Sequence, residues 1–134
     1  WKREGRMSLS GYIADQAPRW TNIHLWLPFL NHPQTPVFTG AERISRKMND
    51  VVYYVKMTRP RRGYYDVEYI PITDDPASLP EGEITRRFFK MLEESVREAP
   101  EYYLWTHNRW KRTKEEFDRR FEIVNGKVLE KKNQ

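Results

Sequence analysis

The chain has 134 residues, no cysteine and a net charge of +5, from 24 basic and 19 acidic residues. The lack of cysteine excludes disulfide bonds, zinc-thiolate sites and a cysteine nucleophile, and the lack of an apolar run of ~18 to 20 residues excludes a membrane-spanning helix within this sequence. The positive charge favours acidic partners, which include phosphorylated lipid, an acidic carrier protein and nucleic acid.

The length is that of one compact domain, and the composition is typical of a globular protein. Hydrophobic residues make up 38% of the chain and aromatic residues 14%, which is enough apolar surface to offset the conformational entropy lost on folding. The sequence begins at Trp1, without an initiator methionine or a signal-peptide pattern. We therefore interpret it as a segment of a longer protein.

The first predicted element is a buried strand over residues 7–14, an apolar run that ends at Asp15 and Gln16. This prediction places a carboxylate at the C-terminal end of a strand. Residues 17–36 then combine several prolines with tryptophan and phenylalanine. Such a composition indicates a long irregular loop that is packed by its own aromatic side chains.

Two segments have the periodicity of amphipathic helices. The first covers residues 40–49 and places Ala41, Ile44 and Met48 on one face. The second covers residues 83–98 and is the strongest helix signal in the sequence. Its apolar stripe consists of Ile84, Phe88, Leu92 and Val96.

Two pairs of strands are predicted as hairpins. Residues 51–57 and 64–72 are rich in β-branched and aromatic side chains, which favours an antiparallel pair joined by residues 58–63. Near the C-terminus, Asn125-Gly126 is typical of a two-residue hairpin turn within residues 121–129. Strands and helices together predict a mixed α/β fold.

The segment that follows the second helix contains uncommon residues at fixed spacing, namely Pro100, Glu101, Trp105, His107, Arg109, Trp110 and Lys111. This pattern resembles the closing signature of the bacterial lauroyl/myristoyl acyltransferases of lipid A biosynthesis. Further pieces follow in the family's order: Asp15-Gln16, Pro28-Phe29-Leu30, Phe38-Thr39-Gly40-Ala41 and Gly63-Tyr64. The resemblance covers about residues 1 to 112.

The resemblance implies an α/β fold with a mixed sheet and flanking helices, as the C-terminal fragment of a glycerolipid-acyltransferase-like fold. Residues 1–117 would form the C-terminal part of the acyltransferase domain, and residues 118–134 a charged tail with a short hairpin. It also implies transfer of a fatty acyl chain from acyl carrier protein to a lipid A precursor, with peripheral membrane contact at the cytoplasmic face of the inner membrane. No metal or cofactor is implied.

The reaction of this family uses a His-x4-Asp/Glu pair, because an alcohol that attacks a thioester needs a general base near neutral pH. The residues five positions after His24, His32 and His107 are phenylalanine, valine and arginine. No histidine of the chain therefore forms the pair. We expect the pair to lie upstream of this segment and the chain alone to be inactive.

Asp15 is the candidate for a supporting catalytic role, since strand ends in α/β folds often border the active site. It would orient either the substrate or the missing histidine, and Gln16 would assist as a hydrogen-bonding neighbour in substrate binding. The alternative is that Asp15 caps the following turn, as aspartate commonly does.

Two basic clusters are candidates for substrate binding. Arg59, Arg61 and Arg62 would hold a lipid phosphate or the acidic carrier through paired hydrogen bonds, unless they form a solvated hairpin tip. In the second cluster, Arg109 and Lys111 are the better candidates for ligand contact. We expect the neighbouring Trp105 to be a core residue and His107 a satisfied structural side chain.

Basic residues interleaved with aromatic ones are also typical of proteins that bind single-stranded nucleic acid. The sequence has no helix-turn-helix pattern, RNP-type motif or zinc spacing that supports this alternative, and we expect no nucleic-acid partner. A second alternative is a non-catalytic interaction domain. Binding to acyl carrier protein or lipid A precursor, compared with salt-dependent binding to oligonucleotide, discriminates between these functions.

Overall fold

The computed structural model describes residue 5 and residues 7–131 of the chain. Within these residues the helices are α1 (Gly40–Met48), α2 (Glu83–Glu98) and α3 (Lys114–Arg120), and the strands are β1 (Leu25–Phe29), β2 (His32–Val37), β3 (Val52–Arg61), β4 (Tyr64–Thr73), β5 (Phe121–Val124) and β6 (Lys127–Glu130). Short 3-10 turns lie at Trp20–Asn22 and Pro100–Tyr102. The expected mixture of helices and strands is confirmed. None of the described helices has the length and apolar composition of a membrane span.

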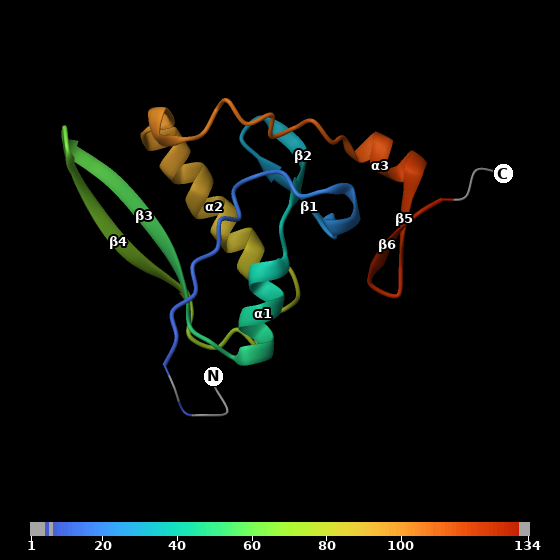
Figure 1. The fold of residues 1–134 in the computed structure, drawn as a ribbon, viewed down its shortest axis with the longest axis horizontal. Coiled ribbons are helices and arrows are strands. Elements are labelled where there is room, and N and C mark those ends of the chain that lie inside the picture. Colours follow the sequence, from blue (N-terminus) through green and yellow to red (C-terminus); the bar gives the residue numbers. More distant parts are fainter. Residues whose placement is uncertain (1–4, 6, 132–134) are drawn as a thin grey trace.

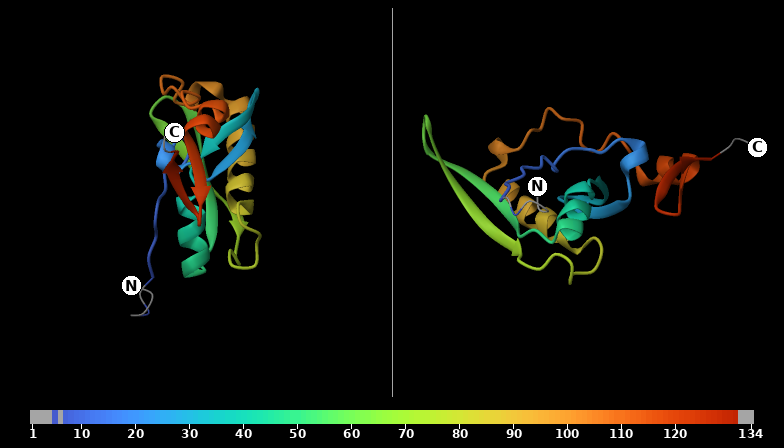
Figure 2. Two further views of the ribbon diagram at one scale, coloured as in Figure 1. Left: turned by 90° about the vertical axis from the view of Figure 1, so that its right-hand side faces the viewer. Right: turned by 60° about the horizontal axis from the view of Figure 1, so that its bottom comes forward.

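The strands of the described residues pair as three separate antiparallel hairpins, rather than as the single mixed sheet expected from the sequence. The β3–β4 hairpin projects on one side of α2 and the β1–β2 hairpin lies on the other, while β5 and β6 lie at the end of the molecule remote from β3–β4 (Figure 1, Figure 2). A larger sheet needs strands that pair along both edges. Each described strand pairs along one edge alone.

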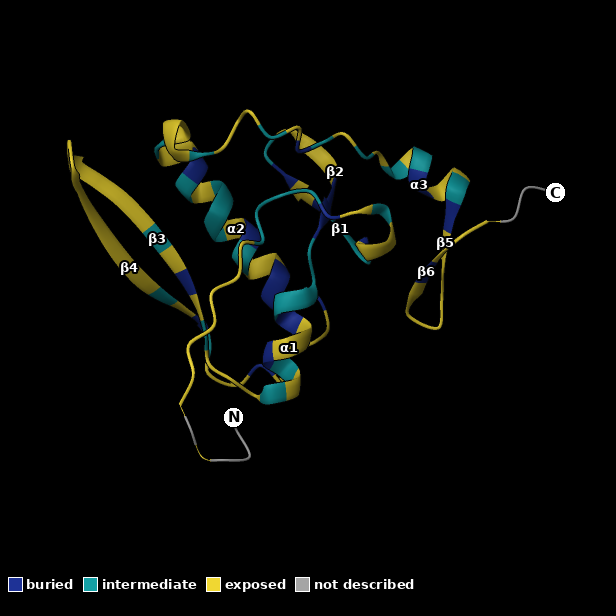
Figure 3. Ribbon diagram, in the orientation of Figure 1, coloured by how far each residue is buried: buried dark blue, intermediate teal, exposed yellow. Residues whose placement is uncertain are grey.

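The core is built around α2, whose bounds are those that its apolar stripe predicts (Figure 3). One buried cluster joins α2 to the β1–β2 hairpin through Leu27, Phe29, Val37, Phe89 and Val96. A second cluster joins α2 to the β3–β4 hairpin through Tyr54, Ile72 and Ile84. The helix therefore holds the two hairpins in fixed positions on its opposite sides.

The predicted helix over residues 40–49 is confirmed as α1, but the face that it buries is not the apolar one. Its buried residues are Glu42 and Ser45, whereas Ile44 is 47% exposed. The Glu42 carboxylate accepts hydrogen bonds from the backbone N–H of Gly82 at 2.6 Å and of Thr85 at 3.0 Å, and from the Thr85 hydroxyl. Backbone N–H groups in the first turn of a helix have no partner within the helix. A polar link to the start of α2 therefore overrides the apolar pattern of α1.

Residues 7–14 do not form the buried strand predicted for them. They run as an extended segment without strand pairing, and Met7 and Leu9 are fully exposed. A buried strand needs neighbours that pair with its backbone and cover its side chains. No described strand pairs with this segment, so the prediction fails for the described chain.

Residues 17–36 are more ordered than the irregular loop predicted for them, because most of them form the β1–β2 hairpin. Leu30 occupies the turn with a positive φ of 54°. Pro28 falls where the strand register shifts between Leu27 and Phe29. Proline cannot donate to a ladder but is tolerated at bulges and on edge strands. The prolines therefore mark an irregular hairpin and not a loop.

The C-terminal segment folds against residues 20–26. Asn125 and Gly126 both have positive φ, at 49° and 73°, and β5 pairs with β6, which confirms the predicted hairpin. α3 was not predicted, and it begins after Thr113, whose hydroxyl accepts the Glu116 N–H at 3.2 Å. Ile23, Phe117, Phe121 and Val128 form the buried cluster of this part. Residues 132–134 of the expected tail lie outside the described residues.

Loss of the Glu42 carboxylate should destabilise the fold. Glu42→Gln removes the charge from three buried hydrogen bonds and turns an amide group toward N–H donors. We expect the free energy of unfolding to fall by about 2 to 3 kcal/mol, because one hydrogen bond to a charged group typically contributes roughly 1.5 to 3 kcal/mol. Urea denaturation followed by circular dichroism measures this change.

The matched control is Glu94→Gln, which alters an exposed glutamate of α2. Its unfolding free energy should stay within about 0.5 kcal/mol of wild type. If both variants unfold at the same urea concentration, Glu42 does not fix the start of α2.

Candidate functional site

Asp15 and Gln16 are half-buried, and the chain around them is fastened to the segment that follows α2. The Tyr103 hydroxyl donates a hydrogen bond to the backbone carbonyl of Asp15 at 3.3 Å, across 88 residues of sequence. The backbone N–H of Ala17 donates to Nε2 of His107 at 3.0 Å, across 90 residues. The backbone is therefore held on both sides of Gln16, although no strand precedes Asp15.

Arg109 lies in the interior beneath this segment. Its side chain is 1% exposed, and its Nη2 donates to the carbonyl of Pro36 at 2.7 Å. The guanidinium carbon lies 5.7 Å from the centre of the Phe89 ring, within the range of a cation–π contact. The Nε and Nη1 atoms are buried without a hydrogen-bond partner among the described residues. Arg109 is thus a buried cation with two unsatisfied donors.

The charge of Arg109 is coupled to Tyr103 and Asp15. Burial lowers the pKa of Arg109, and the nearby Tyr103 and Asp15 act in the opposite direction. Burial of the phenol raises the pKa of Tyr103, with the Arg109 charge opposing this shift and the Asp15 carboxylate adding to it. We call Asp15, Tyr103, His107 and Arg109 the Asp15 corner. Lys111, the other ligand candidate of the motif, is exposed on the surface.

The position of Arg109 bears on its predicted role in ligand contact. A guanidinium that is 1% exposed does not reach a ligand in solution. Gln16 is half-buried and adjacent to Asp15. Three residues predicted from the sequence, Asp15, Gln16 and Arg109, therefore lie at or beside this corner. Tyr103, which lies between Asp15 and Arg109, was not predicted from the sequence.

The two tryptophans of the motif differ in burial. Trp105 is 51% exposed and is not the core residue that was predicted. Trp110 is packed instead: its Nε1 donates to the Thr35 hydroxyl at 2.9 Å, and its ring stacks on His32 with the ring centres 4.0 Å apart. His107 is a satisfied structural side chain, as predicted, because its Nε2 already accepts a hydrogen bond.

The predicted arginine cluster lies at the tip of the β3–β4 hairpin. Arg59, Arg61 and Arg62 are exposed. Arg61 stacks over the Tyr64 ring at 3.6 Å, and Arg59 lies 5.8 Å from the centre of the Tyr102 ring. None of the three arginines forms an ion pair with another described residue. Their charges therefore face solvent.

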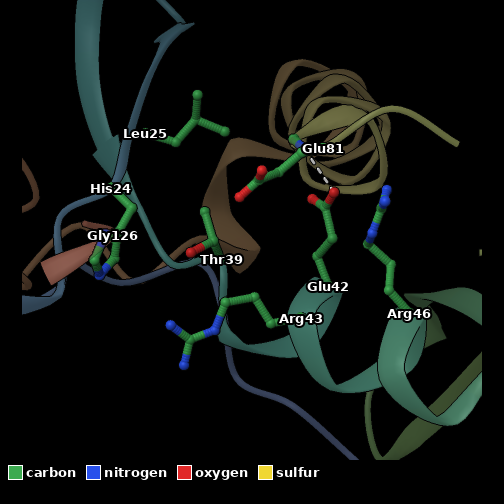
Figure 4. Close-up of a pocket in the computed structure, with 9 residues that line it drawn as sticks. His24, Leu25, Thr39, Glu42, Arg43, Arg46, Glu81 and Gly126 are labelled. Carbon is green, nitrogen blue, oxygen red and sulfur yellow. Dashed lines mark hydrogen bonds between the residues drawn. The ribbon is translucent and has the colours of Figure 1, made fainter. Parts of the chain in front are cut away.

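A cleft of about 680 Å³, which the sequence did not predict, lies where α1 meets the start of β1 and the residues before α2 (Figure 4). Burial lowers the pKa of His24 on its wall, with Arg43 acting in the same direction and Glu81 opposing it. Burial therefore favours the neutral form of the His24 imidazole. The described residues contain no group of three histidine, aspartate or glutamate side chains that could hold a metal ion.

The residues of this cleft are already partly engaged in holding the fold. Glu42 accepts hydrogen bonds from backbone N–H groups at the N-terminus of α2, and Arg46 donates from Nη1 to the Leu79 carbonyl. No cleft residue belongs to the Asp15 corner or to the arginine tip. The cleft is therefore separate from the candidate residues that the sequence predicts.

Comparison with known proteins places most of the chain in one family. A family model described as bacterial lipid A biosynthesis acyltransferase matches residues 3–112. No match was found among curated proteins or among solved structures. The matched range includes the whole Asp15 corner and the arginine tip, and it ends before α3 and the β5–β6 hairpin.

The raised pKa of Tyr103 predicts a loss of stability in alkaline solution. Burial raises this pKa above the usual value near 10.0, so the folded state holds the proton more tightly than the unfolded state. The stability from this group is fully present below pH ~10 and falls as pH rises through the folded-state value. Tyr103→Phe should be less stable than wild type by about 1 kcal/mol at neutral pH, because a hydrogen bond is lost.

The difference in unfolding free energy between wild type and Tyr103→Phe should become smaller above pH ~10. In this range the unfolded wild-type chain ionises its phenol more readily than the folded protein does, so wild type alone loses stability. Urea denaturation across this pH range measures it. Tyr12→Phe, at an exposed tyrosine, is the control, and its difference from wild type should not narrow. A constant difference between wild type and Tyr103→Phe would contradict the assigned burial of the phenol.

Proposed function

Because the chain belongs to the bacterial lipid A biosynthesis acyltransferase family, we propose that it is the C-terminal part of an enzyme that moves a fatty acyl chain from acyl carrier protein to a lipid A precursor. The observation that carries this proposal is the match over residues 3–112, which contains the Asp15 corner. In the proposed enzyme, the chain would be a fragment of a glycerolipid-acyltransferase-like fold. Residues 7–14 and their exposed apolar side chains would then pair with strands outside this segment.

The chemistry requires a base that the described histidines do not supply. When a lipid hydroxyl attacks a thioester, the oxygen bonds to the acyl carbon, the carbon–sulfur bond breaks, and a base takes the hydroxyl proton and returns it to the thiolate. Nε2 of His107 already accepts a hydrogen bond. His32 is stacked on Trp110, and His24 lies in the separate cleft. The proposed enzyme therefore carries its His-x4-Asp/Glu pair upstream of this chain.

Asp15 is the residue of this chain that we place beside the reacting groups. Its backbone is held by the Tyr103 hydroxyl and by the hydrogen bond between Ala17 and His107. The point from which the Asp15 side chain extends is therefore fixed. In this position it orients the upstream histidine or the lipid hydroxyl, with Gln16 as its neighbour. Arg109 acts behind Asp15 as a positioning residue, because its charge acts on the carboxylate and its side chain is buried.

The partners proposed for the enzyme are anionic. Arg59, Arg61 and Arg62 are exposed without ion pairs to described residues, and Lys111 is exposed as well. These cations suit the phosphates of a lipid A precursor and the acidic surface of a carrier protein. The proposed enzyme makes peripheral contact with the cytoplasmic face of the inner membrane. Trp110 is packed against His32 and is not free to stack on bases, so this tryptophan does not support a role in nucleic-acid binding.

Acyl transfer by two proteins tests this function. The longer protein, with its upstream pair, should move an acyl chain from acyl carrier protein to lipid A precursor, and the purified 134-residue chain should show no turnover. Mass spectrometry of the lipid product measures both. Turnover by the chain alone would contradict its proposed dependence on the upstream pair. A longer protein that is inactive with these two substrates would contradict the proposed reaction.

A further inference from the structure

The β3–β4 hairpin has one face that the rest of the described chain leaves uncovered. In its register Val55 faces Tyr69, Met57 faces Val67, and Tyr53 faces Pro71. Opposed residues of an antiparallel pair lie on the same face, and the face alternates along each strand. We call the set Tyr53, Val55, Met57, Tyr65, Val67 and Tyr69 the outer face; each of these residues is between 46% and 60% exposed. The set contains no charged residue.

The opposite face of the hairpin is fixed on α2, so the direction of the outer face is determined. Tyr54 and Ile72 are buried against the helix, and the Tyr54 hydroxyl donates to Ser95 Oγ at 2.9 Å. Further along the strand, Lys56 Nζ forms an ion pair with Glu98 at the end of α2. The outer face therefore points away from the protein, and Figure 3 shows most of the hairpin as exposed.

The charges of the hairpin are separated from its apolar side chains. The acidic residues of β4, Asp66 and Glu68, pair with Thr58 and Lys56 on the face opposite the outer face. The three arginines at the tip form no ion pair with any described residue. The hairpin is thus a ribbon with an apolar, tyrosine-rich face and a cationic end.

We propose that the outer face of β3–β4 docks on an anionic lipid surface, with Arg59, Arg61 and Arg62 on the lipid phosphates. Tyrosine is enriched at membrane–water interfaces because its ring is apolar and its hydroxyl remains hydrated. Basic residues at the end of an amphipathic element add attraction to anionic lipids. An uncovered apolar face bordered by charge is the form that a membrane contact takes on a soluble surface.

The combination of an apolar face with unpaired arginines favours an anionic lipid surface over a nucleic acid and over a second copy of the chain. A nucleic acid would satisfy the arginines but would leave Val55, Met57 and Val67 in contact with polar phosphate and sugar. A second copy that packed its own outer face on this one would cover these side chains, but that face contains no charged residue and would supply no anion for the arginines. The inference rests on the peripheral membrane contact of the proposed function, and it names the surface that makes this contact.

The test is flotation of the 134-residue chain with vesicles of phosphatidylcholine that contain a minority of phosphatidylglycerol, compared with vesicles of phosphatidylcholine alone. Wild type should bind the anionic vesicles preferentially, and high salt should weaken this binding. Arg59→Gln, Arg61→Gln and Arg62→Gln together should weaken binding roughly a hundredfold, because each basic residue near an anionic surface contributes roughly a factor of five.

Two further variants separate the parts of the proposal. Val55→Thr, Met57→Thr and Val67→Thr keep side chains that favour strands but remove apolar contact, and this triple variant should bind both kinds of vesicle less than wild type. The matched control replaces Lys47, Arg86 and Lys90, three exposed cations of α1 and α2, with glutamine. It carries the same loss of charge as the tip variant and should bind like wild type. Circular dichroism confirms that each variant is folded.

Several results would overturn the proposal. The first is an equal loss of vesicle binding in the Arg59, Arg61 and Arg62 variant and in the control variant. The others are equal binding to anionic and neutral vesicles, and tighter binding to an oligonucleotide than to vesicles. Concentration-dependent dimers in ultracentrifugation that the Val55, Met57 and Val67 variant abolishes would assign the outer face to a second copy instead. The flotation experiment contains no acyl donor or acceptor and measures vesicle binding alone. A failure of the membrane proposal can therefore be distinguished from a failure of the proposed acyl transfer.

Discussion

The buried guanidinium of Arg109 connects segments that are remote in sequence. It donates to Pro36 on β2, lies against Phe89 on α2, and acts electrostatically on Tyr103 and Asp15. Transfer of a charge from water to the interior is costly unless the charge is paired. Two of its donors have no partner among the described residues, so stability alone gives no reason to retain an arginine here. A methionine of similar volume would pack in its place without that penalty.

The Asp15 corner explains how a charged residue is useful in that position. Tyr103 and His107 fix the backbone on either side of Gln16, while Arg109 supplies positive charge from below. The C-terminal segment supports the same arrangement, because Trp20 and Trp26 pack on the buried cluster of α3 and the β5–β6 hairpin. Trp20 lies on the stretch of chain that leads from Asp15 to β1, and Trp26 lies within β1. The family match ends at residue 112, so α3 and the β5–β6 hairpin lie outside the matched part.

Sequence patterns predicted the elements whose cause is local. The stripe of α2, the strands of β3–β4 and the Asn125-Gly126 turn each depend on neighbouring residues, and each is confirmed. The buried face of α1 was mispredicted because Glu42 acts on an element 40 residues away. Residues 7–14 carry a strand pattern, but pairing depends on strands that a local pattern does not supply. In the site, the motif identified Asp15 and Arg109, whereas their connection through Tyr103 exists only in three dimensions.

A double-mutant cycle tests most directly whether Arg109 serves acyl transfer by positioning Asp15, as we propose. The cycle measures kcat/KM and melting temperature in the longer protein for wild type, Asp15→Asn, Arg109→Met and the double variant. We predict that each single change lowers kcat/KM at least about tenfold, that Arg109→Met keeps or raises the melting temperature, and that the double variant is no slower than Asp15→Asn alone. Losses that multiply in the double variant, or an Arg109→Met protein that loses stability while keeping its kcat/KM, would contradict the claim.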